Sequence, residues 1–201
     1  MLKRLAKTMR RDERGITGLE TAIILIAFVV VASVFAYTVL SAGIFSSQKG
    51  QEAVYTGLQH ARSTLEMKGD VVAETDGNSS VLSLVVCVAT ALNGETIDMT
   101  EPTNDSGLAG NSSTNVVVVS YSSQGERTDD LAWTATQLGK GNGDDMLDPG
   151  ETFEMTIDLT GITETVDTYH TFNVEIKPPV GSVLVIERTT PAALSDWMIL
   201  H

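Results

Sequence analysis

The chain has 201 residues, of which 42% are hydrophobic and 19% are charged, and its formal net charge is −13 at pH 7. This length fits one domain of ordinary size plus an appendage, and it disfavours two full domains. Because the surplus charge is negative, the chain repels phosphate backbones. The balance excludes nucleic acid as a good partner and favours hydrated cations and an acidic, solvated exterior.

The first 15 residues have the opposite charge. Six basic residues stand there against Asp12 and Glu13, a net charge of +4 that leaves −17 for the rest of the chain. The next segment, from Thr21 to Phe45, has 25 residues and no charge, and a helix of this length can span a bilayer. The positive-inside rule places residues 1–15 in the cytoplasm and the C-terminal bulk outside. The apolar residues expected to pack this helix include Ile23, Ile24, Leu25, Phe28, Val31 and Phe35.

An amphipathic stretch continues this apolar segment without an obvious break. Apolar residues recur at helical spacing at Val54, Leu58, Ala61 and Leu65, with Gly50 and Gly57 as weak points and Gly69 as the expected stop. The predicted helix of about 50 residues is roughly 75 Å long, more than one small domain can bury, so it needs neighbours. We therefore expect a leader at 1–15, a long helix at 16–69 and an outer domain at 70–201.

The outer domain has the period-two pattern of β-strands, punctuated by Gly, Asn and Pro turns. Strands are predicted at residues 81–92, 115–121, 131–138, 153–159, 172–176 and 183–186. The sequence thus predicts an α+β protein: a long N-terminal apolar helix followed by an all-β, immunoglobulin-like sandwich. The tail at 191–201 is either a short helix or extended, and we expect it to pack.

Cys87 is the single cysteine, so no intrachain disulfide can form. Its place in an apolar strand predicts a small buried residue. Three N-glycosylation sequons begin at Asn78, Asn104 and Asn111 in turn-rich sequence. Their clustering favours a glycosylated exterior.

Two cleavage sites are open for the N-terminal segment. An ordinary secretory signal would be cut after Ala36, behind the apolar core. The apolar run continues past Ala36 into the amphipathic stripe, however, and a discarded leader has no need of that continuity. The alternative cut lies between Gly15 and Ile16, before the apolar run.

Residues 14–32, which read RGITGLETAIILIAFVVVA, resemble the start of archaeal flagellins, or archaellins. In that family and in type IV pilins, a prepilin-type peptidase removes a basic leader after Gly, and Glu is the fifth residue of the mature chain. Gly15, Ile16 and Glu20 match those positions. The similarity continues through Phe45 and residues 48–52, so the resemblance covers about a third of the chain. It implies a homopolymeric, extracellular filament subunit for swimming and adhesion, inserted by a membrane assembly machinery.

Glu20 has two interpretations. It is either a solvated residue of the first helical turn, stabilised by the helix dipole, or a partner of the ammonium that cleavage would free on Ile16. The second would neutralise both charges inside a filament, where an unpaired carboxylate is costly.

The segment 139–151 has the chemistry of a cation site. Calcium loops place oxygen ligands at positions 1, 3, 5, 7, 9 and 12. A start at Lys140 supplies the list Asn142, Asp144, the Met146 carbonyl, Asp148 and Glu151. Lys140 at position 1 and Asp145 at position 6 depart from the pattern. The resemblance implies a metal site in the outer domain, so we expect Ca²⁺ or another hard divalent cation; the alternative is a solvated acidic turn.

No motif supports catalysis or an organic cofactor. The three histidines are far apart in sequence, and neither a nucleophile elbow nor a metalloprotease helix occurs. The remaining alternatives are a type IV pilin or adhesin subunit and a membrane-tethered or secreted module that binds cations or glycans. An extracellular hydrolase is remote.

Overall fold

The computed structural model of the chain describes residues 2–77, 80–92 and 94–201, with side chains from residue 17 onward. The chain divides into two compact units, Met1–Val54 and Tyr55–His201. The first unit is helical. The second contains the end of that helix and the β-strands.

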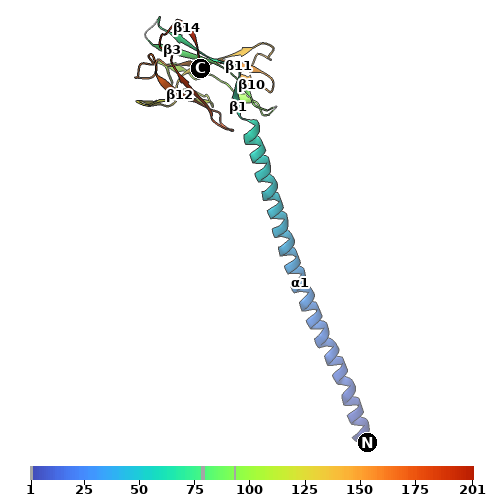
Figure 1. Ribbon diagram of the computed structural model, residues 1–201. Helices are drawn as coiled ribbons and strands as arrows, with labels where there is room; N and C mark the ends of the chain where they lie inside the picture. The colour runs from blue at the N-terminus through green and yellow to red at the C-terminus, as the bar shows by residue number, and fades with distance from the viewer. Residues whose placement is uncertain (1, 78–79, 93) are drawn as a thin grey trace. The chain divides into compact units, whose positions relative to one another are not determined.

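Helix α1 runs from Leu2 to Arg62 without interruption (Figure 1). No proline occurs before Pro102, and the helix passes through Gly50 and Gly57, whose missing side chains leave open space and no contact. Good helix formers on both sides carry the helix through these two positions. The predicted weak points therefore do not break it.

The helix ends at Arg62 and not at residue 69, which corrects the predicted boundary. The backbone N–H of Ser63 still donates to the carbonyl of Gln59 at 3.0 Å. Leu65, predicted to lie on the helical stripe, opens strand β1 (Leu65–Met67), pairs with Thr90 and is 3% exposed. The strand buries Leu65 in the core of the second unit, which outweighs the local helical spacing.

Two antiparallel sheets make up most of the second unit. The six-stranded sheet has the order β14–β2–β3–β11–β9, with β1 also pairing with β3. Besides β1, its strands are β2 (Val71–Thr75), β3 (Val81–Thr90), β9 (Trp133–Leu138), β11 (Thr152–Asp158) and β14 (Trp197–Leu200). Of the two predicted conformations for the tail, the structure shows the extended one. Strand β14 pairs with β2, with Trp197 opposite Glu74 and Leu200 opposite Val71.

The second sheet has four strands in the order β13–β12–β7–β8. They are β7 (Val118–Ser123), β8 (Arg127–Thr128), β12 (Thr171–Lys177) and β13 (Leu184–Thr189). Two short pairs complete the described strands: β4 (Ile97–Asp98) with β10 (Met146–Leu147), and β5 (Asn104–Asp105) with β6 (Leu108–Ala109).

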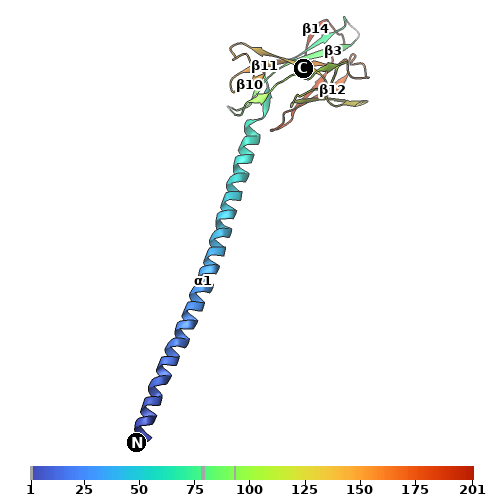
Figure 2. The ribbon, with the colours of Figure 1, turned by 180° about the vertical axis from the view of Figure 1, so that it is seen from behind.

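One hydrophobic core joins the two main sheets. Alternate residues of β11 and β12 are buried, and side chains from both sheets belong to the same cluster. The rings of Tyr121 and Phe172 stack within this cluster, with their centroids 5.9 Å apart. In both views β3 and β14 lie above β12 (Figure 1 and Figure 2). The predicted α+β class, a long helix followed by antiparallel sheets, is confirmed.

Cys87 lies in the predicted strand, but its predicted burial is wrong. Val86 and Val88 point into the core, so the period of two turns Cys87 to the outer face, where it is partly exposed. Partial burial raises the pKa of its thiol, and the carboxylate of Glu154 on the neighbouring strand raises it further.

Candidate assembly surface and acidic loop

The apolar side chains of α1 have no partner within the described chain. Exposures run from 58% to 73% for the residues expected to pack this helix, Ile23, Ile24, Leu25, Phe28, Val31 and Phe35. Together with Ile26, Val29 and Val30, which are also exposed, they cover all sides of the helix, a pattern typical of a helix surrounded by apolar material. By length and composition, Thr17–Arg62 can also cross a membrane.

Glu20 lies one turn after the predicted cleavage point, and its side chain is exposed. Gly15 and Ile16 fall within α1, but their side chains lie outside the described residues. Among residues 17–62, Glu20 forms no ion pair; the one pair there joins Lys49 to Glu52. If Glu20 pairs inside a filament, its counter-charge comes from outside residues 17–62.

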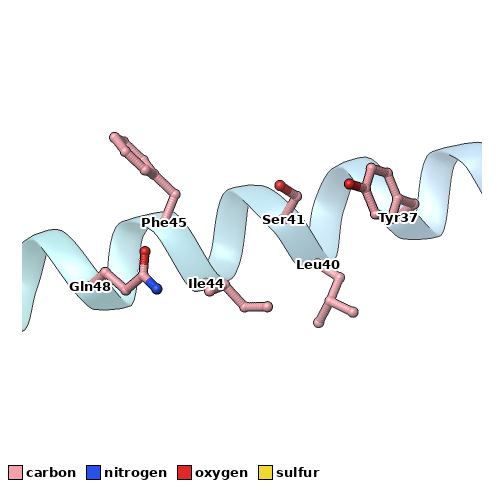
Figure 3. A pocket seen from close by; sticks show the side chains of 6 residues that line it. All are labelled: Tyr37, Leu40, Ser41, Ile44, Phe45 and Gln48. Atoms are coloured by element: carbon pink, nitrogen blue, oxygen red, sulfur yellow. The ribbon is translucent and has the colours of Figure 1, made fainter.

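A shallow groove of about 310 Å³ lies along the C-terminal part of the apolar segment. Its lining combines apolar and polar side chains: Tyr37, Leu40, Ser41, Ile44, Phe45 and Gln48 (Figure 3). Figure 3 shows Ser41 and Phe45 projecting from one side of the helix and Leu40 and Ile44 from the other. The groove therefore combines apolar side chains with the polar groups of Tyr37, Ser41 and Gln48.

The acidic loop brings three of its predicted ligands together. The amide nitrogen of Asn142 donates to Asp144 Oδ2 at 2.9 Å and to Asp148 Oδ2 at 3.2 Å. Glu151 is used differently, because its carboxylate accepts the backbone N–H groups of Asn142 and Asp148, each at 3.2 Å. Met146 opens β10, where it pairs with Asp98.

The loop is held by residues that sequence spacing did not indicate. Thr96 donates its hydroxyl to Asp148 Oδ1 at 2.6 Å, and Gln137 accepts the backbone N–H of Gly143 at 2.9 Å. Thr96 lies far from the loop in sequence, so only folding could reveal its contact. Among the described residues, no group of three or more His, Cys, Asp or Glu side chains is arranged to hold a metal. The oxygen-rich donor set of the loop nevertheless suits a hard cation.

The sequons differ in their surroundings. Asn104 donates its amide to Asp158 Oδ2 at 2.8 Å and accepts the N–H of Gly107 at 2.8 Å, so both ends of its side chain are engaged. Asn111 is exposed in a turn, and the described residues offer its side chain no hydrogen bond. Asn78 lies outside the described residues.

Comparisons with known proteins identify this combination of apolar helix and β-domain. The model of the archaeal-type flagellin family matches residues 15–188. Probable flagellin 1 of Archaeoglobus fulgidus is 35% identical over 198 residues, which cover 94% of this chain and 96% of the relative. Probable flagellin 1 of Aeropyrum pernix is 32% identical over 92% of this chain and 95% of its own. The chain therefore belongs to the archaeal-type flagellin family.

Solved structures support the same assignment. The archaeal flagellum of Methanospirillum hungatei strain JF1 gives a TM-score of 0.66 at 29% identity, covering 92% of this chain and 99% of that one. Flagellin FlaB1 of Methanocaldococcus jannaschii gives 0.53 at 14% identity, covering 69% and 96%, which shows a shared fold. Archaeal flagellins are structural filament subunits of the archaellum, and the family is a structural one.

Proposed function

We propose that this archaellum filament subunit polymerises through α1, while the β-sandwich forms the outer domain. The observation that carries the proposal is the exposure of the apolar side chains of α1, such as Phe28 at 73%. A similar chain occurs in a polymerised archaeal flagellum. Full-length similarity to flagellins favours a subunit for swimming over the pilin and secreted-module alternatives.

The energetics favour polymerisation. Burying about twelve large apolar side chains at about 1.5–3 kcal/mol each contributes on the order of 20–30 kcal/mol per subunit relative to water. This is an upper bound, because the precursor would wait in a membrane and not in water. Packing against other helices then adds contacts between side chains that lipid does not supply.

Substitution of one apolar helix residue that the proposed filament would bury tests the proposal. We expect Phe28→Asp, expressed in cells that lack the native gene, to abolish filaments and swimming, because a carboxylate in an apolar core is costly. Val185→Asp is the matched control, since Val185 is 56% exposed on β13 of the outer domain. Electron microscopy would count filaments, and immunoblots of the membrane fraction would verify that both variants are inserted. Normal filament numbers for Phe28→Asp would refute the role of α1.

We further propose that a prepilin-type peptidase cuts after Gly15, and that the freed ammonium of Ile16 pairs with Glu20. Loss of the basic leader would let the subunit leave the membrane for the growing extracellular filament. Mass spectrometry of purified filaments tests the cut: a chain that starts at Ile16 supports it. A start at Tyr37 or at Met1 contradicts it. We expect Glu20→Gln to process normally and to assemble poorly.

Cation binding by the acidic loop is a second proposal. It is favoured by the convergence of Asp144 and Asp148 on the amide of Asn142. These three residues would hold Ca²⁺, and Glu151 would close the loop through the backbone. We expect the double variant Asp144→Ala with Asp148→Ala to lower thermal stability only when Ca²⁺ is present. An equal loss under chelation would show that the carboxylates act without a metal.

Glycosylation of the outer domain is a third proposal, and the surroundings of the sequons favour Asn111 over Asn104. Transfer of a glycan to the side-chain nitrogen of Asn104 would disturb the hydrogen bonds of this side chain with Asp158 and Gly107. Mass spectrometry of glycopeptides from filaments tests this ranking. A glycan on Asn104 with none on Asn111 would reverse it.

A further inference from the structure

The polar side chains of the uncharged helical segment fall into two groups. In the first, each hydroxyl bonds to the helix itself: Ser33 donates to the carbonyl of Val29 at 2.7 Å, and Thr38 to that of Phe35 at 2.8 Å. Such back-bonding satisfies the hydroxyl inside the helix. These residues can enter an apolar environment without another partner.

Tyr37 and Ser41 form the second group. Among the described residues, neither hydroxyl has a hydrogen-bond partner, and Tyr37 is 72% exposed. They lie four residues apart, and Gln48 follows Ser41 by seven, so the three residues fall on one face of the helix. Together they supply the polar part of the groove in Figure 3, between the apolar side chains of the same helix.

Unpartnered hydroxyls are harmless in water but costly in an apolar core. If α1 is buried in the filament, as the proposed function states, these groups need donors and acceptors from outside their own helix. Lipid chains offer neither, and the backbone groups of a neighbouring helix are already paired within that helix. The side chains of the same stripe on another subunit supply both, because hydroxyl and amide groups donate and accept.

We propose that Tyr37, Ser41 and Gln48 form a polar stripe that binds α1 of a second copy and fixes the axial register between the two helices. Apolar side chains along a helix tolerate sliding, whereas a hydrogen bond between two polar groups is made at one offset only. A single polar position in an apolar seam sets register in coiled coils by the same physics. The inference rests on the proposed function and adds the residues that align the subunits.

Two conservative variants test the stripe, each with a matched control. Ser41→Ala removes an unpartnered hydroxyl, whereas Ser33→Ala removes one that bonds to its own helix. Tyr37→Phe removes only the phenolic oxygen, and Tyr169→Phe makes the same change at a residue of nearly equal exposure, 73%, outside α1 and just before β12. Purified filaments of each variant would be heated, and the subunits released would be measured by sedimentation.

We expect the ratio of released to polymerised subunit to rise about threefold for each lost hydrogen bond, the effect typical of bonds between apolar helices. Ser33→Ala and Tyr169→Phe should match the unmodified protein. A stripe variant that stays in the membrane without assembling counts as the same loss, provided that Ser33→Ala assembles. If Ser41→Ala and Tyr37→Phe filaments are as stable as their controls, or the controls lose as much, the stripe has no such role.

The experiments distinguish failure of the proposed function from failure of the polar stripe. Should Phe28→Asp abolish filaments while Ser41→Ala and Tyr37→Phe remain unaffected, α1 forms the core but its register is set elsewhere. Should Phe28→Asp assemble normally, the helical core itself is wrong, and the stripe falls with it.

Discussion

Glu126 holds a loop of the outer domain by its charge. It lies in the turn between β7 and β8, and its carboxylate accepts the backbone N–H of Thr163 at 3.0 Å and that of Glu164 at 2.7 Å. The hydroxyl of Thr128 donates to it at 2.9 Å. Hydrogen bonds from Thr163, followed by those from Glu164 and Thr128, lower the pKa of Glu126 from 4.5 to about 2, against a smaller opposing effect of burial.

The sign of the pH dependence follows from this shift. The pKa is depressed in the folded state, so the stabilisation is present above pH 4.5 and is lost as the pH falls towards 2. At full strength the shift corresponds to about 3 kcal/mol, and because the carboxylate is partly exposed, solvent screening reduces this to roughly 1–2 kcal/mol. For a domain of this size, the melting temperature of Glu126→Gln should fall by about 2–8 °C at pH 7.

Circular dichroism of the full-length protein in detergent, melted between pH 7 and pH 2, measures this effect. Glu126→Gln should melt below the unmodified protein at pH 7, and the two curves should converge as the pH approaches 2. Glu187→Gln is the control, because Glu187 is an exposed carboxylate of β13 for which the described residues show no side-chain hydrogen bond. The reasoning is refuted if Glu126→Gln and the unmodified protein have the same melting temperature at pH 7. It is also refuted if their melting temperatures still differ at pH 2.

Three further predictions concern the outer domain. Ile157→Ala should cost about 2–5 kcal/mol, measured by denaturant unfolding, because Ile157 is fully buried; a cost below 1 kcal/mol would contradict its place in the core. Gly107→Ala should lower the melting temperature, since Gly107 has φ +85° and an added Cβ would lie 2.1 Å from the nitrogen of Gly161; an unchanged melting temperature would argue against this close approach. Alkylation of Cys87 at pH 7.5 should be slower than that of a free thiol and faster in Glu154→Gln, because burial and the Glu154 carboxylate raise the pKa of the thiol; equal rates in the two proteins would exclude the carboxylate effect.

The long helix and the strand-rich domain could be predicted because their signals are local. The uncharged run from Thr21 to Phe45 predicts an apolar helix by composition alone, and residues 14–32 indicate the family by a contiguous signature. The period of two predicts the main strands to within a few residues, as for β11 and β12. In each case, neighbouring residues carry the whole pattern.

The end of α1, the tail and the acidic loop were decided by contacts between distant residues. Leu65 fits a helical stripe equally well, but pairing with Thr90 makes it a strand. Strand β14 exists because β2 offers it an edge, and Thr96 reaches Asp148 only after folding.

For this protein, then, the sequence by itself determined the apolar helix, the β-rich class and the family. The tertiary structure decided where the helix stops, which strands are neighbours and which polar groups of α1 remain unpartnered. The physical reason is range: periodicity and hydrophobicity are properties of adjacent residues, whereas strand pairing and hydrogen-bond satisfaction depend on groups that only the folded chain brings together.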